Sequence, residues 1–263
     1  MPRSEGYDGS SFFEFLKLER PHLLPDFRLD LTAGRELIEQ ALKGTTILAL
    51  KFNQGAIIAG DRRATEGHQI AGRYLEKVYK ADEHSAIAMA GAAGPCLEVA
   101  RLFQVELEHY EKLEGAELSL EGKANRLSQM VRANLPLAIQ GLVVIPIFVG
   151  YDLSKDEGKI YKYDVTGGRY EEREYYATGS GGMAARNSMK KLYRKGLERR
   201  EALRVALEAL YDASEEDAGT APPDLVKDIF PTTRLITKEG FQAASDAETK
   251  EICVEIMEER KAA

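Results

Sequence analysis

Residues 41–65 read ALKGTTILALKFNQGAIIAGDRRAT, and this stretch decides the fold. An apolar run begins at Thr45 and Thr46, whose branched Cβ atoms suit a pleated strand. Gly55 then marks a tight turn, and a second apolar run follows over residues 56–60. The stretch therefore predicts two consecutive strands, the first of which starts directly after Gly44.

The residues before this pair lack the same regularity. Pro21 and Pro25 interrupt them, and only a short helix is expected, over residues 34–44. The segment SSFFEFLKLERPHLL, residues 10–24, breaks its apolar positions with charged ones, which the core of a signal peptide does not do. The leader is therefore not expected to be a targeting signal, and its purpose needs another explanation.

Composition excludes several classes of protein. The net charge of −7 and the absence of a Lys/Arg cluster argue against nucleic-acid binding. Two cysteines form no disulfide framework, and four scattered histidines form no metal-ligand spacing, so neither a metal nor an organic cofactor is expected. The longest apolar run, residues 142–151, is too short to span a bilayer and contains Pro146. A cytoplasmic protein without a membrane partner is expected.

The order of elements after Thr45 predicts the architecture. Strands are expected first, then two helices, strands, two helices, a strand and a last helix. Such grouping suggests two sheets packed face to face, each covered by helices on its outer side, in one domain. The strands are expected at 45–53, 56–65, 77–91 (two strands around a turn at 81–85), 145–152, 159–167, 168–179 and 233–244. The helices are expected at 95–113, 119–141, 182–195 and 201–213, followed by an acidic helix that ends at Ala263.

Three features of these elements suggest chemistry. Asp61 interrupts the second strand, and Lys77 directly precedes an apolar run. The two form either an ion pair at a sheet edge or a positive charge held beside a nucleophilic threonine. The turn GSGGMA, residues 179–184, either binds phosphate or lets the Ser180 hydroxyl approach another segment closely.

A set of motifs resolves these alternatives by resemblance. The chain resembles the β-subunit family of proteasomes, most closely the actinobacterial type, over residues 45–263. The resemblance implies the N-terminal-nucleophile hydrolase fold, an α+β structure with four αββα layers. It also implies that residues 1–44 are a propeptide cut off by the subunit itself, between Gly44 and Thr45. The motifs are GTT at 44–46, GDRRAT at 60–65, KVY at 77–79, AGAAGP at 90–95, GSGG at 179–182 and DAGTAPPDL at 217–225.

The resemblance assigns roles to residues that match the family pattern. Thr45 is the expected nucleophile, and its freed α-amino group, with a reference pKa of about 7.7–8.0, is the base. Lys77 supplies positive charge and Asp61 orients it. The remaining expectations are Gly91 as the oxyanion N–H donor, Ser180 and Asp217 around the amine, Thr65 and Ala93 along the substrate backbone, and Met89 at the base of an apolar specificity pocket.

The chain departs from the family pattern in one loop. Thr220 stands where serine is frequent, which keeps the hydroxyl, and Pro222 and Pro223 replace a glycine pair. Two other functions stay open. One is the simpler two-ring ATP-dependent peptidase HslV, which typically has glycine where this chain has Arg62. The other is a non-catalytic ring subunit, which the combination of Thr45, Asp61 and Lys77 disfavours.

The resemblance also implies partners. Heptameric β-rings are expected to stack between α-rings of the 20S core, and an ATPase ring is expected to feed them unfolded, tagged proteins. An N-terminus at Thr45 in the purified chain would separate the two catalytic readings from the structural one.

Overall fold

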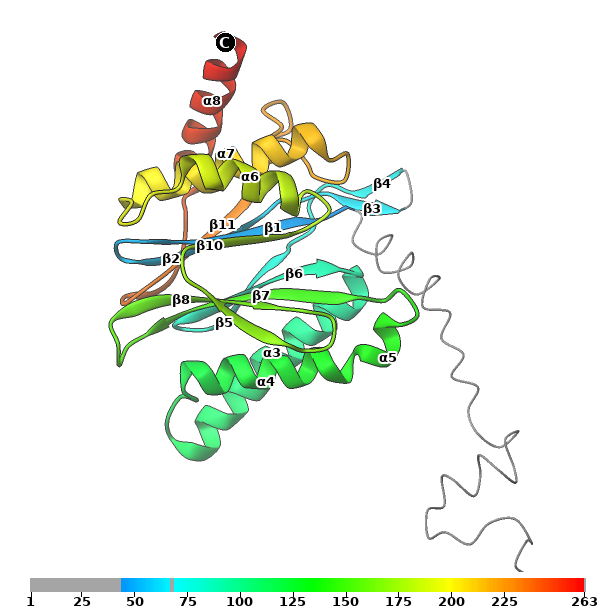
Figure 1. Cartoon of the computed structure of the whole chain (residues 1–263), viewed down its shortest axis with the longest axis vertical. Helices are drawn as coiled ribbons and strands as arrows, with labels where there is room; N and C mark the ends of the chain where they lie inside the picture. The colour runs from blue at the N-terminus through cyan, green and yellow to red at the C-terminus, as the bar shows by residue number, and fades with distance from the viewer. Residues whose placement is uncertain (1–43, 67–68, 263) are drawn as a thin grey trace, which may run out of the picture.

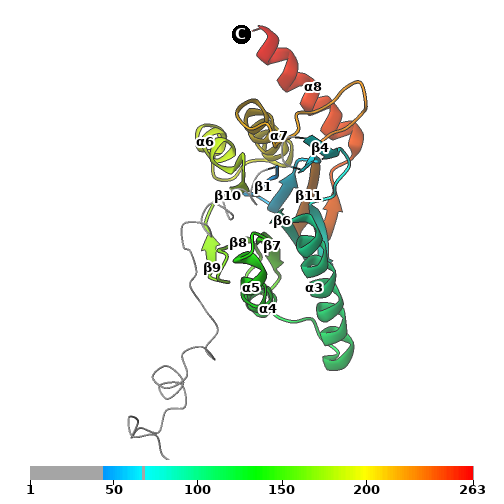
Figure 2. The same ribbon diagram turned by 90° about the vertical axis from the view of Figure 1, so that its right-hand side faces the viewer.

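The computed structural model describes residues 44–66 and 69–262. The expected leader helix and all but the last residue of the expected propeptide lie outside this part. Within it, two five-stranded sheets lie face to face, and helices cover both outer sides (Figures 1 and 2). This is the four-layer α+β sandwich that the sequence predicts.

The first sheet has the order β10-β1-β2-β11-β12 and is antiparallel throughout. Helices α6, α7 and α8 cover its outer face (Figure 1). The strands are β1 (Thr46–Phe52), β2 (Gly55–Gly60), β10 (Tyr175–Gly179), β11 (Thr232–Thr237) and β12 (Gly240–Ala243), and the helices are α6 (Gly182–Leu192), α7 (Arg199–Glu216) and α8 (Asp246–Ala262).

The second sheet has the order β5-β6-β7-β8-β9 and carries α3 and α4 on its outer face. A separate small hairpin, β3 with β4, extends from the end of β2 (Figure 1). The strands are β3 (Ala64–Glu66), β4 (Gln69–Gly72), β5 (Val78–Asp82), β6 (Ser85–Gly91), β7 (Val144–Asp152), β8 (Glu157–Tyr163) and β9 (Arg169–Glu172), and the helices are α3 (Ala93–Glu114), α4 (Leu120–Ala133) and α5 (Leu135–Ala138).

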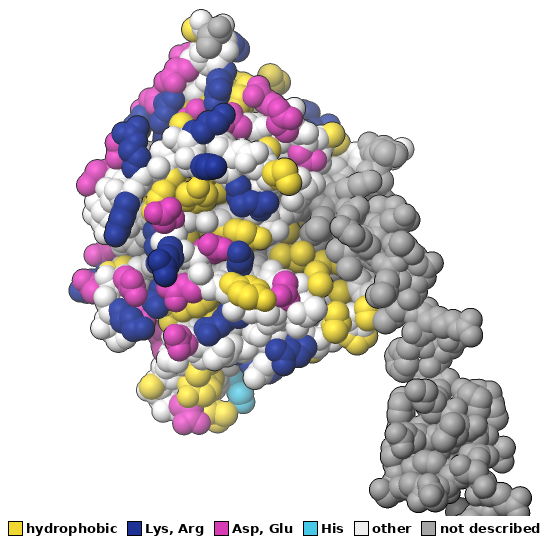
Figure 3. Space-filling view, in the orientation of Figure 1, with side chains coloured by type: hydrophobic (Ala, Val, Ile, Leu, Met, Phe, Trp, Pro, Cys, Tyr) yellow, Lys and Arg dark blue, Asp and Glu magenta, His cyan; other side chains and the backbone are white. Residues whose placement is uncertain are grey.

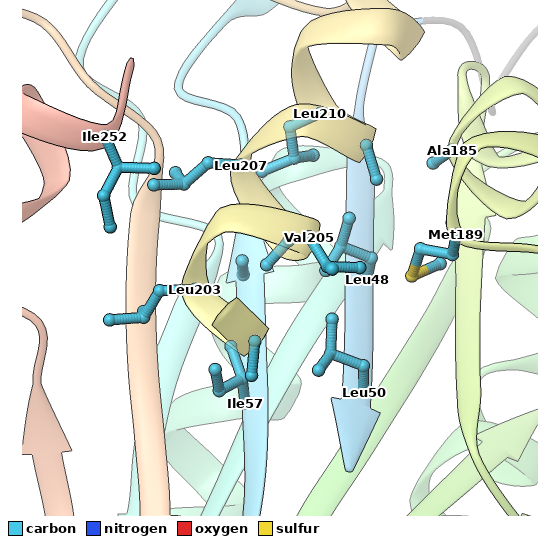
Figure 4. Packing of buried hydrophobic residues seen from close by; sticks show 14 of the residues in the cluster. Leu48, Leu50, Ile57, Ala185, Met189, Leu203, Val205, Leu207, Leu210 and Ile252 are labelled. Carbon is cyan, nitrogen blue, oxygen red and sulfur yellow. The ribbon is translucent and has the colours of Figure 1, made fainter. Parts of the chain in front are cut away.

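Strand β1 shows how the layers are held together. Its successive side chains point to opposite faces, so Ile47 and Ala49 pack between the two sheets while Leu48 and Leu50 pack beneath α7. Figure 4 shows Leu48 and Leu50 facing Val205 and Leu210 of α7. All four β1 side chains are fully buried, and burial of one Ile or Leu contributes about 1.5–3 kcal/mol. The start of β1 is therefore fixed in position.

Four expected elements differ in extent. The helix expected at 119–141 is interrupted at Asn134, because Pro136 cannot continue α4 and lies in the first turn of the separate short helix α5. The strand expected at 56–65 ends at Gly60, and Asp61 lies outside the sheet. The segment at 233–244 forms the hairpin β11–β12, which turns at Lys238 and Glu239.

The strand expected at 168–179 is also wrong as a single element. Its first part, β9, pairs with β8 in one sheet, and its second part, β10, pairs with β1 in the other. Arg173 and Glu174 carry the chain from one sheet to the other, and both are exposed. Two charged residues are common on a protein surface, so nothing in the sequence shows that the chain changes sheets here.

Two surface observations accompany the fold. Among the described residues, no helix is long and apolar enough to cross a membrane. On the face that Figure 3 shows, Lys and Arg side chains alternate with Asp and Glu. That face therefore carries no continuous basic surface of the kind that nucleic-acid binding requires.

Candidate active site

The site surrounds Thr45, the residue directly before β1. Thr45 is buried, with 8% of its surface exposed. Gly44 has φ of +103°, and a Cβ atom there would lie 1.8 Å from the Thr65 hydroxyl oxygen. Gly219 is also close to Gly44, since a Cβ at position 219 would lie 2.5 Å from the Gly44 Cα. Position 44 therefore accepts glycine only, and the peptide bond before Thr45 runs through a tight turn.

Asp61 is a fully bonded buried carboxylate beside this turn. Its Oδ1 accepts from the Lys77 ammonium at 2.6 Å and from the Thr46 N–H at 2.9 Å. Its Oδ2 accepts from the N–H groups of Arg63 at 2.9 Å and Ala221 at 3.1 Å. These four hydrogen bonds fix the carboxylate in position.

Lys77 faces the peptide bond before Thr45. It is 2% exposed, and its Nζ donates to the Gly44 carbonyl oxygen at 3.3 Å. Burial lowers the pKa of Lys77 from its ordinary value, and the charge and hydrogen bond of Asp61 offset this only in part. A lysine in this state can stabilise negative charge on the carbonyl oxygen and release a proton readily.

A second group of polar side chains lies near Thr45 at the end of β10, the edge strand beside β1. The Thr45 N–H lies 3.3 Å from the Ser180 hydroxyl oxygen, and the Gly44 N–H lies 3.1 Å from the same atom. Ser180 donates to Asp217 Oδ2 at 2.5 Å, and Thr220 donates to the same oxygen at 2.6 Å. Ser180 follows β10 and Asp217 follows α7, so segments that lie far apart in sequence meet at Thr45. This is the close approach that the glycine-rich turn predicts, rather than a phosphate site.

Gly91 ends β6 at the border of the site. It has φ of +123°, and a Cβ there would lie 2.1 Å from the Val143 carbonyl oxygen, so no larger residue fits. Two residues earlier, the Met89 N–H donates to the Lys77 carbonyl at 2.9 Å. Because N–H groups two residues apart leave the same edge of a strand, the Gly91 N–H is expected on the edge of β6 that faces Lys77.

The remaining expected residues lie around this centre. Met89 is 3% exposed and packs with Cys96 in the core between β6 and α3. Ala93 is the exposed first residue of α3, and Thr65 on β3 lies against Gly44.

Three residues of the site carry no role in the sequence analysis. The Arg63 guanidinium donates to the carbonyls of Ala218 at 2.7 Å and Thr220 at 3.2 Å, which ties the Asp217 loop to the end of β2. The Thr46 hydroxyl lies 2.6 Å from the Thr220 hydroxyl. Gly219 gives the loop room beside Gly44. The only sequence signal for Thr46 is the threonine doublet itself.

The fold and these contacts together define a class. A threonine at the start of a central strand, facing a buried lysine–aspartate pair in an αββα sandwich, is the arrangement of an N-terminal-nucleophile hydrolase.

Comparison with known proteins gives the family. The profile described as "Proteasome subunit" matches residues 41–223. The protein "Proteasome subunit beta" of Streptomyces griseus is 52% identical over 251 residues, 95% of this chain and 89% of its own. The proteins of the same name from Acidothermus cellulolyticus and Acidimicrobium ferrooxidans are 53% and 56% identical, over 90% and 82% of this chain and 82% and 80% of theirs. The chain belongs to the proteasome family, in its β-subunit branch.

This membership confirms the family, the fold and the activity that the sequence motifs predict. The chain is a β-type subunit of a 20S core, where it assembles with α-subunits and acts as a threonine-type protease in protein degradation.

Proposed function

We propose that residues 1–44 are a propeptide that the subunit removes itself, and that Thr45 then acts as the nucleophile of a threonine endopeptidase. The observation that carries this proposal is the 3.3 Å contact between Lys77 Nζ and the Gly44 carbonyl oxygen, made while the same ammonium pairs with Asp61 at 2.6 Å. A buried positive charge on the carbonyl that precedes Thr45 has no evident structural purpose, but it stabilises the oxyanion that self-cleavage requires.

Self-cleavage proceeds in two steps. The Thr45 hydroxyl oxygen attacks the Gly44 carbonyl carbon, and Lys77 stabilises the resulting oxyanion. The C–N bond then breaks, the nitrogen takes up the proton that the attacking hydroxyl loses, and an ester joins Gly44 to the Thr45 oxygen. Water hydrolyses this ester, releases residues 1–44 with a free carboxylate, and leaves Thr45 with a hydroxyl and a free amine. The turn at Gly44 places the reacting atoms in one small ring, which favours the attack.

The mature enzyme uses the same atoms on other peptide bonds. The Thr45 amine takes the proton of the Thr45 hydroxyl, because a free α-amino group has a reference pKa of about 7.7–8.0 and can act as a base near neutral pH. Ser180 and Asp217 hold the amine, Lys77 provides positive potential, and the Gly91 N–H receives the oxyanion of the substrate. Thr65 and Ala93 bind the substrate backbone as an added strand, and Met89 forms the base of the pocket for the residue before the cut bond.

The assembly extends beyond the subunit. We infer heptameric β-rings stacked between α-rings in the cytoplasm, with an ATPase ring that delivers unfolded, tagged proteins. The HslV alternative is disfavoured because the relatives reported above all bear the name proteasome subunit beta. The non-catalytic alternative is disfavoured because Asp61, Lys77 and Ser180 converge on Thr45.

Covalent labelling tests the proposed nucleophile. A peptide β-lactone acylates an activated hydroxyl, and the adduct is mapped by tandem mass spectrometry of the assembled particle. We expect the label on Thr45 as the first residue of the chain, no label in Thr45→Ala, and labelling retained in Thr45→Ser. Label on another residue, or on Thr45 within an uncut chain, would contradict the proposal.

A further inference from the structure

Thr46 lies between the two groups of polar side chains at Thr45. Its backbone N–H donates to Asp61 Oδ1 at 2.9 Å, and its carbonyl accepts from the Asp61 N–H at 3.1 Å. Its side chain points to the opposite side, where the hydroxyl contacts Thr220 at 2.6 Å and accepts from the Gly181 N–H at 3.0 Å. Thr46 is fully buried, so no water competes for these contacts. Thr46 therefore joins the Lys77 side of the site to the Asp217 side, as Arg63 and the Ala221 N–H also do.

The protons of this network can point in only one direction. A carboxylate only accepts, so Ser180 and Thr220 both spend their single hydroxyl proton on Asp217 Oδ2. The Thr220 oxygen then accepts a hydrogen bond, and among the described residues the hydroxyl beside it is that of Thr46. The Thr46 oxygen in turn accepts the Gly181 N–H. Each member therefore donates toward Asp217.

Ser180 completes the order on the side of Thr45. Its oxygen also lies 3.3 Å from the Thr45 carbonyl, but the nearer and charged Asp217 takes the proton. The Ser180 oxygen is thereby left to accept from the Thr45 nitrogen at 3.3 Å. After propeptide removal this nitrogen is the amine that must accept the hydroxyl proton.

Gly181 shows that the network leaves no spare room. A Cβ at this position would lie 2.5 Å from the Thr46 hydroxyl oxygen and 2.8 Å from that of Thr220. The 2.6 Å contact between Thr46 and Thr220 is thus held by the backbone around it, and either side chain can be replaced only by one of the same shape.

We propose that Thr46 is a positioning residue for the amine of Thr45, acting through the hydroxyl of Thr220 and the carboxylate of Asp217. This proposal rests on the proposed function of Thr45. A hydroxyl that accepts a hydrogen bond is a stronger donor, so Thr46 strengthens the bond from Thr220 to Asp217. It thereby compensates negative charge that would otherwise favour the protonated, inactive form of the amine.

The pH dependence of activity depends on the charged groups that surround the Thr45 amine. Asp61 and Lys77 face Thr45 from the ends of β2 and β5, and Asp217 faces it from the end of α7. The Arg63 guanidinium donates to the carbonyls of Ala218 and Thr220, in the loop that follows Asp217. Thr46→Val changes none of these charges and keeps the shape of the side chain. A shift in the profile therefore reports the hydroxyl network alone.

The test compares kcat/KM against pH for a short fluorogenic peptide on the assembled, processed particle. For Thr46→Val we expect the acid limb to move up by about half a pH unit, a loss of about threefold below the limb. Thr46→Ser should restore the wild-type limb. Thr233→Val is the matched control, since Thr233 is a buried threonine of β11 whose hydroxyl has no partner within the described residues. It should leave the limb in place.

A double-variant cycle makes the test independent of a single substitution. If Thr46 acts through Thr220, the pair Thr46→Val and Thr220→Val should shift the limb no further than Thr220→Val alone. Should Thr46→Val not assemble, Thr46→Ala takes its place in the comparison. An unmoved limb in the Thr46 variant, or additive shifts in the pair, would overturn this inference. Activity of Thr45→Ala would instead overturn the proposed function.

Discussion

In the described part of the chain, two buried lysines pair with aspartates, and their surroundings differ. Lys77 is 2% exposed and has one carboxylate, Asp61, at 2.6 Å. Lys123 on α4 is 4% exposed and has two, Asp82 at 2.7 Å and Glu117 at 2.8 Å. Burial opposes the charge in both cases. The pKa of Lys77 is lowered, whereas the two carboxylates outweigh burial and raise the pKa of Lys123.

We propose that this difference separates a functional lysine, Lys77, from a structural one, Lys123. Lys123 forms ion pairs with two carboxylates, which favour its charged form, and its pair with Asp82 connects α4 to β5. Lys77 shares Asp61 with three backbone N–H groups, and its Nζ also reaches the Gly44 carbonyl. A partly compensated cation aimed at a carbonyl can act on that carbonyl. Burial alone therefore does not distinguish a functional lysine from a structural one, and the number of carboxylates around the lysine is more informative.

Of the two lysines, Lys77 should have the larger effect on activity when it is removed. In Lys77→Ala we expect peptide hydrolysis to fall by about 10²–10³-fold or more, because the positive charge beside the nucleophile is gone. The subunit should still fold, since Asp61 keeps its three backbone donors. Lys77→Arg should not restore activity, because the larger guanidinium does not fit the same contacts. Steady-state rates answer this, with Lys123→Met as the matched control that stays active.

Asp61→Asn should reduce activity in the same direction and by less. An amide cannot accept all four hydrogen bonds of the carboxylate, and it removes the charge that supports the Lys77 ammonium. Loss of one charge-assisted bond of about 1.5–3 kcal/mol corresponds to roughly 10–100-fold in rate. The same peptide assay measures it, and a rate equal to wild type would show that Lys77 needs no orienting partner.

Lys123→Met should reverse the pattern, with stability lost and activity kept. Asp82 and Glu117 are partly exposed, so the expected loss is about 1–3 kcal/mol rather than the full cost of a buried charge. The folded pKa of Lys123 is raised above 10.5, so its contribution is complete below pH 10.5 and is lost as pH rises through the folded pKa. Melting temperatures of wild type and variant should therefore converge only in strong alkali. Equal melting temperatures at neutral pH would contradict the structural role.

The smallest effect concerns substrate preference at Met89. A flexible apolar side chain at the base of the pocket should favour sizeable apolar residues before the cut bond, by about tenfold over charged ones. Fluorogenic peptides that end in leucine or tyrosine, arginine, and aspartate compare these directly. A clear preference for aspartate would contradict the pocket assignment.

The sequence predicts the fold well where apolar patterns are continuous. The four layers follow from the order of strands and helices, and β1, β6 and α7 lie where their patterns place them. The crossing at Arg173 and Glu174 is missed because two short strands on different sheets follow one another with no break signal. The end of α4 is missed because the apolar residues continue beyond Asn134, although the helix itself ends there and a separate short helix, α5, begins.

The site is predicted only in part, for a physical reason. The motifs locate Thr45, Asp61 and Lys77, and the contact of Ser180 with Thr45 follows from small residues in its turn. Thr46 is missed because its backbone belongs to an ordinary strand, and only its three-dimensional partners, Thr220 and Gly181, distinguish its hydroxyl from that of other strand threonines.

Intact-mass spectrometry of the assembled particle tests the central claim most directly. The account predicts that the wild-type chain begins at Thr45, whereas Thr45→Ala keeps residues 1–44 because no hydroxyl is present to attack the Gly44 carbonyl. The same variant should show no peptidase activity, a loss on the order of a million-fold. If Thr45→Ala still loses residues 1–44 without added protease, self-cleavage by Thr45 is wrong.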